Sequence, residues 1–236
     1  MCFVDLKKAY DRVPRDILWE VLQEYGVPGL LLRAVRSLYS RSESCVRILN
    51  IKSDPFNVSV GLRQGCALSR LLFVIFMDRV SRRSRGQEGI MCGGRKVASL
   101  LFADDVVLLA ESHGCLQHSL ERFAAECEVV GLRISTSKYE SIVLARKRMA
   151  CLLQVRGKDL PQVEEFKYLG VLFTSDGKRD REIGRRLGQA AAVMRSLYRT
   201  VVVKRELSHK AKLSVYRSVY IPTLTYGWRA TLYLIG

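Results

Sequence analysis

Residues 99–110 read SLLFADDVVLLA, two apolar runs that flank the acidic pair Asp104-Asp105. The runs have the length and the branched apolar side chains of buried strands, so they predict a tight hairpin. Asp-Asp suits such a turn poorly, because hairpin turns favour Asn-Gly or Asp-Gly. Two like charges at the end of a dry hairpin also oppose ionisation unless a cation neutralises them. The alternative interpretation is an acidic surface turn.

A second acidic position, Asp5, ends the apolar run at residues 2–4. If this run pairs with the hairpin in one sheet, Asp5 lies beside Asp104 and Asp105. Two or three clustered carboxylates form a hard-oxygen site of the kind that Mg²⁺ or Mn²⁺ prefers. Two such ions, about 3.5 to 4 Å apart, stabilise the attacking and the leaving oxygen in phosphoryl transfer. The carboxylates therefore predict a divalent-metal site suited to chemistry on phosphates.

The composition is that of a folded protein with an unusual charge. The 236 residues are 48% hydrophobic and 26% charged, which excludes disordered and low-complexity proteins. The net charge of +16 favours a polyanionic partner, such as nucleic acid or an acidic membrane surface. The seven cysteines include no Cys-x-x-Cys pair, which argues against a zinc finger and against a disulfide-stapled secreted module.

No feature of the sequence indicates a membrane-spanning segment or a secretory route. The longest apolar stretch is far below the roughly 18 to 20 residues that span a bilayer, and the first residues lack the pattern of a signal peptide. We expect a nuclear or cytoplasmic protein that is not secreted and has no membrane partner.

The positive charge is concentrated late in the chain. Basic residues number 20 against 15 acidic ones up to residue 139, and 19 against 8 after it. From Asp176 to Arg217, basic residues alternate with apolar residues spaced three to four apart, which predicts an amphipathic helix with a basic outer face. Two interpretations stay open for this face, a solvated surface and a surface that follows a phosphate backbone.

The remaining pattern mixes helices and strands. We expect a helix between Pro14 and Gly26, a second one ending near Leu38, and further helices over residues 68–83 and 114–130. Strands are expected at 44–51 and 56–60, joined by the loop 52–55, and at 141–145 and 166–173. This order predicts an α+β fold followed by basic helices.

Five stretches together resemble motifs A to E of reverse transcriptases, in order and in spacing. The similarity extends over nearly the whole chain, and it is closest to the enzymes of non-LTR (LINE-type) retrotransposons. The stretches are FVDLKKAYD at 3–11, GLRQGC at 61–66, FADD at 102–105, GLRI through Lys138 at 131–138, and FKYLG at 166–170.

The resemblance implies a role for each residue of the acidic centre and of the nucleotide site. Asp5 and Asp104 would bind two Mg²⁺ or Mn²⁺ ions, and Asp105 would complete the acidic turn. Tyr10 would be the steric gate that rejects a ribose 2′-hydroxyl, although an aromatic residue at this position could equally be a packed core residue. Nucleotide and template contacts would come from Arg63, Gln64 and Gly65.

The resemblance also implies roles later in the chain. Lys138 would donate a proton to the leaving pyrophosphate, although on its own it reads as a surface lysine. Tyr168, Leu169 and Gly170 would form the primer grip, which positions the primer 3′ end for in-line attack. The nucleic-acid backbone would contact four cations of the basic helices, Arg185, Arg186, Lys204 and Arg205.

The fold implied is a polymerase palm, an antiparallel sheet with packed helices, over residues 1–175. A basic, thumb-like helical segment would follow over residues 176–236. Because only four residues precede Asp5, we expect the fingers subdomain to be largely missing and the chain to be a fragment of a polyprotein. The chain also reads Ala67-Leu68-Ser69-Arg70 where the family usually has Pro-Leu-Ser-Pro. We expect Ser69 to cap the helix that follows.

The function implied is RNA-directed DNA polymerisation. A primer 3′-hydroxyl would attack the α-phosphate of a dNTP, with an RNA template and a DNA primer as partners, and the fragment alone could be inactive. One alternative is a catalytically silent remnant that only binds nucleic acid. Another is a relative of the intron maturases, in which the same palm mainly binds RNA.

Overall fold

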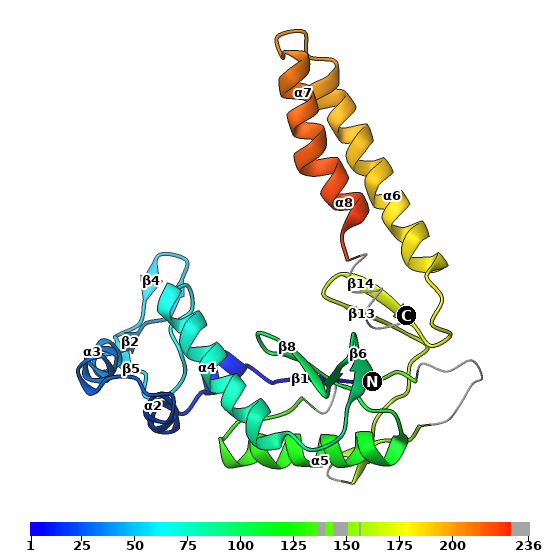
Figure 1. Ribbon diagram of the computed structural model, residues 1–236. Helices are drawn as coiled ribbons and strands as arrows, with labels where there is room; N and C mark the ends of the chain where they lie inside the picture. The colour runs from blue at the N-terminus through cyan, green and yellow to red at the C-terminus, as the bar shows by residue number, and fades with distance from the viewer. Residues whose placement is uncertain (136–139, 144–150, 156, 228–236) are drawn as a thin grey trace. The chain divides into compact units, whose positions relative to one another are not determined.

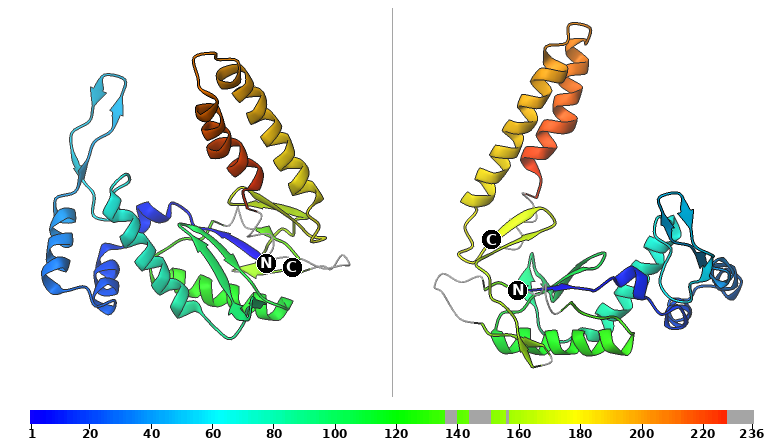
Figure 2. Two further views of the ribbon diagram at one scale, coloured as in Figure 1. Left: turned by 45° about the horizontal axis from the view of Figure 1, so that its top comes forward. Right: turned by 180° about the vertical axis from the view of Figure 1, so that it is seen from behind.

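The computed structural model describes residues 1–135, 140–143, 151–155 and 157–227. The chain divides into two compact units. The first comprises residues 1–91, 96–141 and 152–161, and the second consists mainly of the chain from Gln162 onward. Figures 1 and 2 show the elements of each unit.

The first unit is built on a four-stranded antiparallel sheet with strand order β10-β1-β9-β8. The strands are β1 (Cys2–Asp5), β8 (Ser99–Phe102), β9 (Asp105–Leu108) and β10 (Glu140–Ser141). The predicted hairpin is therefore present as β8 and β9, and the first apolar run pairs with it as β1. Three consecutive residues of β1, Cys2 to Val4, are at most 4% exposed, which explains why this strand is apolar without alternation.

The helices of the first unit accompany this sheet and supply its core. They are α1 (Ala9–Arg12), α2 (Arg15–Glu24), α3 (Gly29–Ser40), α4 (Ala67–Ser84) and α5 (His113–Val129). Helix α5 runs along one face of the sheet and packs against α4, which also contacts α2 (Figure 1). Phe73 and Phe76 of α4 and Phe123 of α5 are fully buried. The aromatic side chains of two helices thus form the centre of the core.

Replacing Phe123 with alanine is expected to lower the free energy of unfolding by about 3 to 4 kcal/mol, because the cavity left behind adds to the lost transfer energy. Phe56→Ala is the matched control, since Phe56 is 47% exposed, and it should change stability by less than about 1 kcal/mol. Chemical denaturation of the chain measures both. Equal losses in the two variants would contradict this placement of the core.

Helix α4 begins differently from the expectation. Its N-cap is Cys66, so Ser69 lies inside the first turn and does not cap the helix. The Ser69 hydroxyl is buried and hydrogen bonds with the Tyr39 hydroxyl at 2.9 Å. The predicted cap was wrong because a buried tyrosine from α3 provides this serine with a partner.

The hairpin expected over residues 44–60 is present with a different turn. Its strands are β2 (Glu43–Ser44), β3 (Arg47–Ile48), β4 (Ile51–Lys52) and β5 (Phe56–Asn57). β2 pairs with β5 and β3 pairs with β4, so the chain reverses at Leu49 and Asn50 and not at the predicted loop 52–55. Leu49 has φ 53, a value that no simple residue preference predicts for leucine.

The second unit combines a β-hairpin with a helical hairpin. The strands are β13 (Glu165–Tyr168) and β14 (Val171–Thr174), and the helical segments are α6 (Asp180–Leu197), η1 (Tyr198–Val202), α7 (His209–Val215), η2 (Tyr216–Tyr220) and α8 (Ile221–Thr225). α6 packs against η2 and α8, which run back along it (Figure 2). The single strand predicted at 166–173 was wrong, because the chain reverses at Leu169 and Gly170.

The remaining strands are β6 (Ile90–Cys92), β7 (Arg95–Val97), β11 (Gln154–Val155) and β12 (Lys158–Asp159). Separate sheets and helices in both units confirm the predicted α+β class. Within the described residues, we find no helix with the length and apolar character needed to cross a bilayer.

Candidate functional site

The pairing of β1 with β9 brings the predicted carboxylates together. Asp5 lies directly opposite Asp105 in the antiparallel register, and Asp104 precedes Asp105 in the turn between β8 and β9. Opposed residues of an antiparallel pair have Cβ atoms about 4.5 to 5.5 Å apart and lie on the same face of the sheet. Partial burial, followed by the negative charges of Asp104 and Asp5, raises the pKa of Asp105. Asp104 and Asp5 are thus close enough to Asp105 to oppose its ionisation.

These carboxylates fit an open divalent-cation site. Where residues are described, no group of three or more His, Cys, Asp and Glu side chains is arranged to hold a metal ion by itself. Mg²⁺ does not need such a group, because it keeps several waters and uses one or two carboxylates together with substrate phosphates. The pKa of Asp105 is raised because partial burial and nearby negative charges oppose its ionisation. A bound cation would offset these charges and favour the ionised form.

A glycine loop is held against α1, next to the carboxylates. The amide of Gly61 donates to the Val13 carbonyl at 2.9 Å, and the amide of Leu62 donates to the Tyr10 carbonyl at 2.8 Å. A Cβ atom at Gly61 would lie 2.7 Å from the Asp11 carbonyl oxygen, so this close approach requires glycine. The loop and α1 are therefore joined through their backbones.

This contact creates a pocket of about 330 Å³. Its lining residues come from α1, the glycine loop, the start of α4 and the β8–β9 turn: Lys8, Ala9, Tyr10, Asp11, Arg63, Gln64, Gly65, Cys66, Ser69, Arg70 and Asp104. The Gln64 side-chain amide donates to Asp11 at 2.9 Å, which fixes its place across the pocket. The pocket combines three cations with carboxylates at one edge, a combination suited to a metal-bound phosphate group.

Aromatic contacts hold two of the lining residues. The Tyr10 ring stacks on the buried Phe73 ring with 4.2 Å between centroids and an angle of 21° between planes. The Arg63 guanidinium lies 5.6 Å from the centre of the Tyr39 ring, and its Nη2 donates to the Ser42 hydroxyl at 3.2 Å. Both side chains are therefore positioned by packing before any ligand binds.

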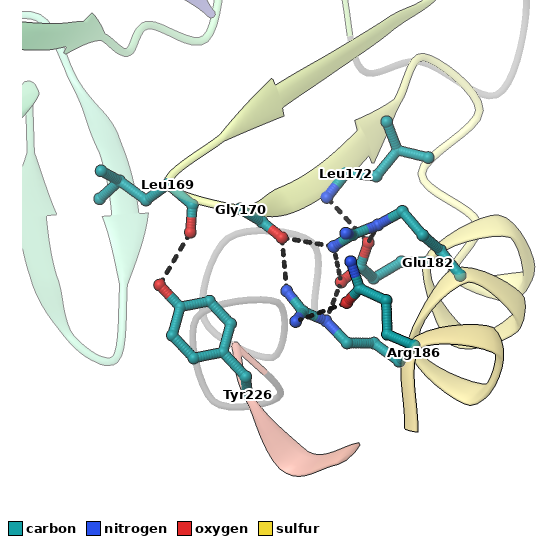
Figure 3. Close-up of polar contacts among 8 residues, drawn as sticks. Leu169, Gly170, Leu172, Glu182, Arg186 and Tyr226 are labelled. Atoms are coloured by element: carbon teal, nitrogen blue, oxygen red, sulfur yellow. Dashed lines mark hydrogen bonds and ion pairs between the residues drawn. The ribbon is translucent and has the colours of Figure 1, made fainter. Parts of the chain in front are cut away.

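In the second unit, the turn between β13 and β14 is held by side chains from the helices (Figure 3). The Tyr226 hydroxyl donates to the Leu169 carbonyl at 2.8 Å. The guanidinium groups of Arg185 and Arg186 both donate to the Gly170 carbonyl. Glu182 accepts hydrogen bonds from both arginines, Arg185 at 2.8 Å and Arg186 at 2.7 Å. The two residues that follow β13, Leu169 and Gly170, are thus the focus of a polar network.

Comparison with known proteins assigns the chain to a family. Residues 1–173 match the model of the family described as "Reverse transcriptase (RNA-dependent DNA polymerase)". The chain belongs to the reverse transcriptase family. The match covers Asp5, Asp104 and Asp105, the glycine loop and the β13–β14 turn.

Relatives of this reverse transcriptase domain include retrotransposon proteins of insects. It is 30% identical over 75% of its length to the R2 "Retrovirus-related Pol polyprotein" of Nasonia vitripennis, covering 18% of that protein. It is 27% identical over 94% of its length to the R2DM polyprotein of Drosophila melanogaster, covering 22% of it. Against the "RNA-directed DNA polymerase from mobile element jockey" of Drosophila melanogaster, it is 23% identical over 95% of its length and covers 25% of that protein.

The predicted resemblance to non-LTR retrotransposon reverse transcriptases is confirmed by these relatives. The chain spans about a fifth to a quarter of the length of each of the three.

The structure of the reverse transcriptase domain groups most of the predicted site residues. Asp5, Asp104 and Asp105 lie together, and Asp104 also lines the pocket that contains Tyr10, Arg63, Gln64 and Gly65. Tyr168, Leu169 and Gly170 lie at one turn of the second unit. The predicted Lys138 lies outside the described residues.

The four predicted phosphate-binding cations fall into two pairs. Lys204 and Arg205 are exposed in the connection between η1 and α7, where a backbone phosphate can reach them. The side chains of Arg185 and Arg186 are only 23% and 12% exposed, and their donors are engaged by Glu182 and Gly170. For this second pair, the geometry favours a contact within the protein.

Strained backbone marks the same places. Among the described residues, four other than glycine have positive φ: Lys8, Leu49, Ala103 and Leu169. Lys8 lines the pocket, Ala103 precedes Asp104 in the acidic turn, and Leu169 precedes Gly170. Such conformations cost of order 1 to 3 kcal/mol and cluster at functional sites. Backbone geometry thus points to the same three places as the sequence motifs.

Several pocket and turn residues were not predicted. Lys8, Cys66 and Arg70 line the pocket but belong to no role that the resemblance implied. Arg70 was noted only as a departure from proline, and its charge beside the glycine loop is the feature that could have indicated it. Glu182 and Tyr226 had no recognisable sequence feature, because they lie 12 and 56 residues after Gly170.

Replacing Glu182 with glutamine is expected to lower the free energy of unfolding by about 2 kcal/mol at pH 7. Burial would raise the pKa of Glu182, but the hydrogen bonds from Arg185, Arg186 and the Leu172 amide outweigh burial and lower it. A lowered pKa stabilises the fold above the ordinary value of 4.5, and this contribution is lost as the pH falls through the lowered value.

The difference between wild type and Glu182→Gln should therefore shrink as the pH is lowered below about 4.5. Denaturation at a series of pH values measures it. Glu206→Gln, at an exposed glutamate of the same unit, is the control and should show no such trend. A difference that grew towards low pH would contradict the network.

Proposed function

We propose that this chain carries the catalytic core of an RNA-directed DNA polymerase, which adds dNTPs to the 3′-hydroxyl of a primer paired with an RNA template. The observation that supports it most is the register of β1 and β9, which sets Asp5 opposite Asp105, beside Asp104, which lines a cationic pocket. Carboxylates and cations side by side suit a substrate that is both metal-bound and polyphosphorylated. Family membership supports the same reaction.

In this proposal, the first unit serves as the polymerase palm, and Asp5, Asp104 and Asp105 hold two Mg²⁺ or Mn²⁺ ions. When bound, such ions lower the barrier by stabilising charge on the attacking and leaving oxygens. The carboxylates contribute negative charge at a fixed place, the end of the ladder between β1 and β9. Because the strand pairing fixes them, little reorganisation is needed when substrate arrives.

The pocket is proposed as the site of the incoming nucleotide. Gln64 and Gly65 contact nucleotide and template, Arg63 binds phosphate, and Tyr10 faces the sugar as a steric gate. Stacking on Phe73 suits Tyr10 for this role, because a ring that cannot move rejects an added hydroxyl by clash. Lys138 is proposed, by resemblance alone, to give a proton to pyrophosphate.

The second unit is proposed to act on the primer and the duplex. The turn of Tyr168, Leu169 and Gly170 holds the primer end, and Lys204 and Arg205 bind the nucleic-acid backbone. Residues 1–175 would form the palm and residues 176–236 a thumb-like segment. The remaining parts of a polyprotein, including fingers and an endonuclease, would be partners outside this chain, as the much longer relatives suggest.

The test is incorporation of dNTPs onto a DNA primer annealed to an RNA template, with Mg²⁺ or Mn²⁺, by the chain alone and within a longer polyprotein. Incorporation that requires both template and metal supports the proposal. Salt-sensitive binding without incorporation in either form would overturn it and favour a nucleic-acid-binding remnant. The groove lined by His209, Lys210 and Arg217 would suit such binding.

A further inference from the structure

The turn between β13 and β14 has a backbone that its own sequence does not favour. Its two central residues, Leu169 and Gly170, have φ 46 and 78. Two-residue hairpin turns with positive φ at both positions prefer Asn-Gly, since asparagine tolerates the first position and a branched apolar residue does so poorly. Something outside the turn must therefore hold Leu169 in this conformation.

The side chains that hold the turn come from both legs of the helical hairpin. Arg185 and Arg186, in the second turn of α6, donate to the Gly170 carbonyl, and Tyr226, just after α8, donates to the Leu169 carbonyl at 2.8 Å. Two successive carbonyls are thus fixed from two directions (Figure 3). The conformation of the turn depends on the helices as much as on the strands.

The buried carboxylate of Glu182 orients the guanidinium groups of Arg185 and Arg186. Glu182 is 7% exposed, and it accepts hydrogen bonds from both arginines and from the Leu172 amide of β14 at 3.0 Å. The Arg186 guanidinium also lies 4.7 Å from the centre of the Tyr226 ring. Glu182, Arg185, Arg186 and Tyr226, here named the turn clamp, form one connected network with the backbone of the hairpin.

We propose that the turn clamp positions the primer end: Glu182, Arg186 and Tyr226 fix the Leu169–Gly170 turn so that the 3′-terminal nucleotide is held at one place. This inference rests on the proposed function, in which that turn grips the primer. The clamp residues are positioning residues, because they touch the turn and not the substrate. Arg185 and Arg186 thereby have a role that their place on a basic helix did not indicate.

Two conservative variants test the clamp. Tyr226→Phe removes one hydroxyl, and Arg186→Lys keeps the charge but loses the planar donor group that reaches Glu182 and Gly170 together. Their matched controls are Tyr198→Phe and Arg195→Lys, at exposed residues of the same helical hairpin. Circular dichroism of each variant verifies that the helices form.

The incorporation rate, the Kd for primer–template and cross-linking together distinguish binding of the duplex from positioning of the primer 3′ end. We expect Tyr226→Phe to lower the maximal rate of incorporation about fivefold and Arg186→Lys about tenfold, with the Kd for primer–template within about twofold of wild type. Cross-linking from a photoreactive 3′-terminal nucleotide to residues 168–170 should fall in parallel. Cross-linking from a nucleotide several positions upstream should stay unchanged, as should all readouts in the controls.

Other outcomes overturn the clamp. A rise in Kd and a smaller salt dependence of binding for an Arg186→Gln variant, with the maximal rate unchanged, would mean that Arg186 binds a phosphate. Unchanged rate and cross-linking in both clamp variants would leave the network without a positioning role.

The two proposals fail in different ways. If wild type incorporates no dNTP, the polymerase proposal fails. The cross-linking experiment still tests the turn clamp, because it requires only that the primer–template binds. If the 3′-terminal nucleotide of wild type does not cross-link to residues 168–170, the clamp proposal fails even where incorporation occurs.

Discussion

Asp104→Asn is expected to lower template-directed dNTP incorporation by about 10³-fold or more. The asparagine amide has nearly the same shape as the carboxylate but carries no charge, so it cannot offset a divalent cation. Asp104 lies in the two-residue turn between β8 and β9, where it lines the pocket beside Tyr10 and Gln64. Single-turnover incorporation on an RNA template measures the loss, and Asp5→Asn should show a loss of similar size.

Binding of primer–template should survive in these variants, since removing a negative charge does not weaken attraction to a polyanion. Asp54→Asn is the matched control, because Asp54 is an exposed carboxylate in the connection between β4 and β5, and its incorporation should equal that of wild type. Incorporation by Asp104→Asn at the wild-type rate would contradict the metal assignment and leave Asp104 as an acidic surface turn.

The acidic centre could be predicted from the sequence because strand patterns are local. Two apolar runs separated by two residues at 99–110 favour pairing as a hairpin, and the fully apolar run at residues 2–4 is suited to an inner strand. The expectation that Asp5 lies beside Asp104 and Asp105 needed one long-range pairing, that of β1 with β9. The family resemblance made that pairing specific.

The interior of the second unit could not be predicted in the same way. The sequence pattern predicts that basic residues in this region face solvent, and Lys204 and Arg205, in the connection between η1 and α7, are exposed. Arg185 and Arg186 differ because α6 begins beside a β-turn whose carbonyls need donors, and because Glu182 is one helical turn away. The 3.6-residue spacing of apolar residues predicts which face of a helix is buried. It does not predict which segment of the chain packs against the N-terminal end of the helix.

Turns were the least predictable elements for a related reason. The chain reverses at Leu49-Asn50 and at Leu169-Gly170, and in each case a leucine takes a positive φ. Local preference favours glycine or asparagine there, so surroundings and not propensity decide the conformation. In the second turn, those surroundings are the side chains of Tyr226, Arg185 and Arg186, the last two 15 and 16 residues after Gly170.

Tyr10→Ala is expected to raise the ratio of ribonucleotide to deoxyribonucleotide incorporation by about 10³-fold. The Tyr10 ring is held against Phe73 and lines the pocket, so a 2′-hydroxyl on the incoming sugar would meet a surface that cannot move away. Alanine removes that surface and leaves the carboxylates in place. Incorporation of dNTPs should therefore fall by less than about tenfold, while rNTP incorporation rises.

The stacking of Tyr10 on Phe73 suggests a control variant and a second variant that test this prediction. Tyr10→Phe keeps the ring and its stacking on Phe73, so its selectivity should match that of wild type. Phe73→Leu keeps Tyr10 but removes the aromatic surface 4.2 Å away, and it should shift selectivity part of the way because the gate can then move. Competition between rNTP and dNTP in one reaction measures all three variants. If Tyr10→Ala lowered the incorporation of rNTP and dNTP equally, Tyr10 would be a packed core aromatic whose loss only weakens the pocket. The selectivity for deoxyribose would then have to come from another residue that lines the pocket.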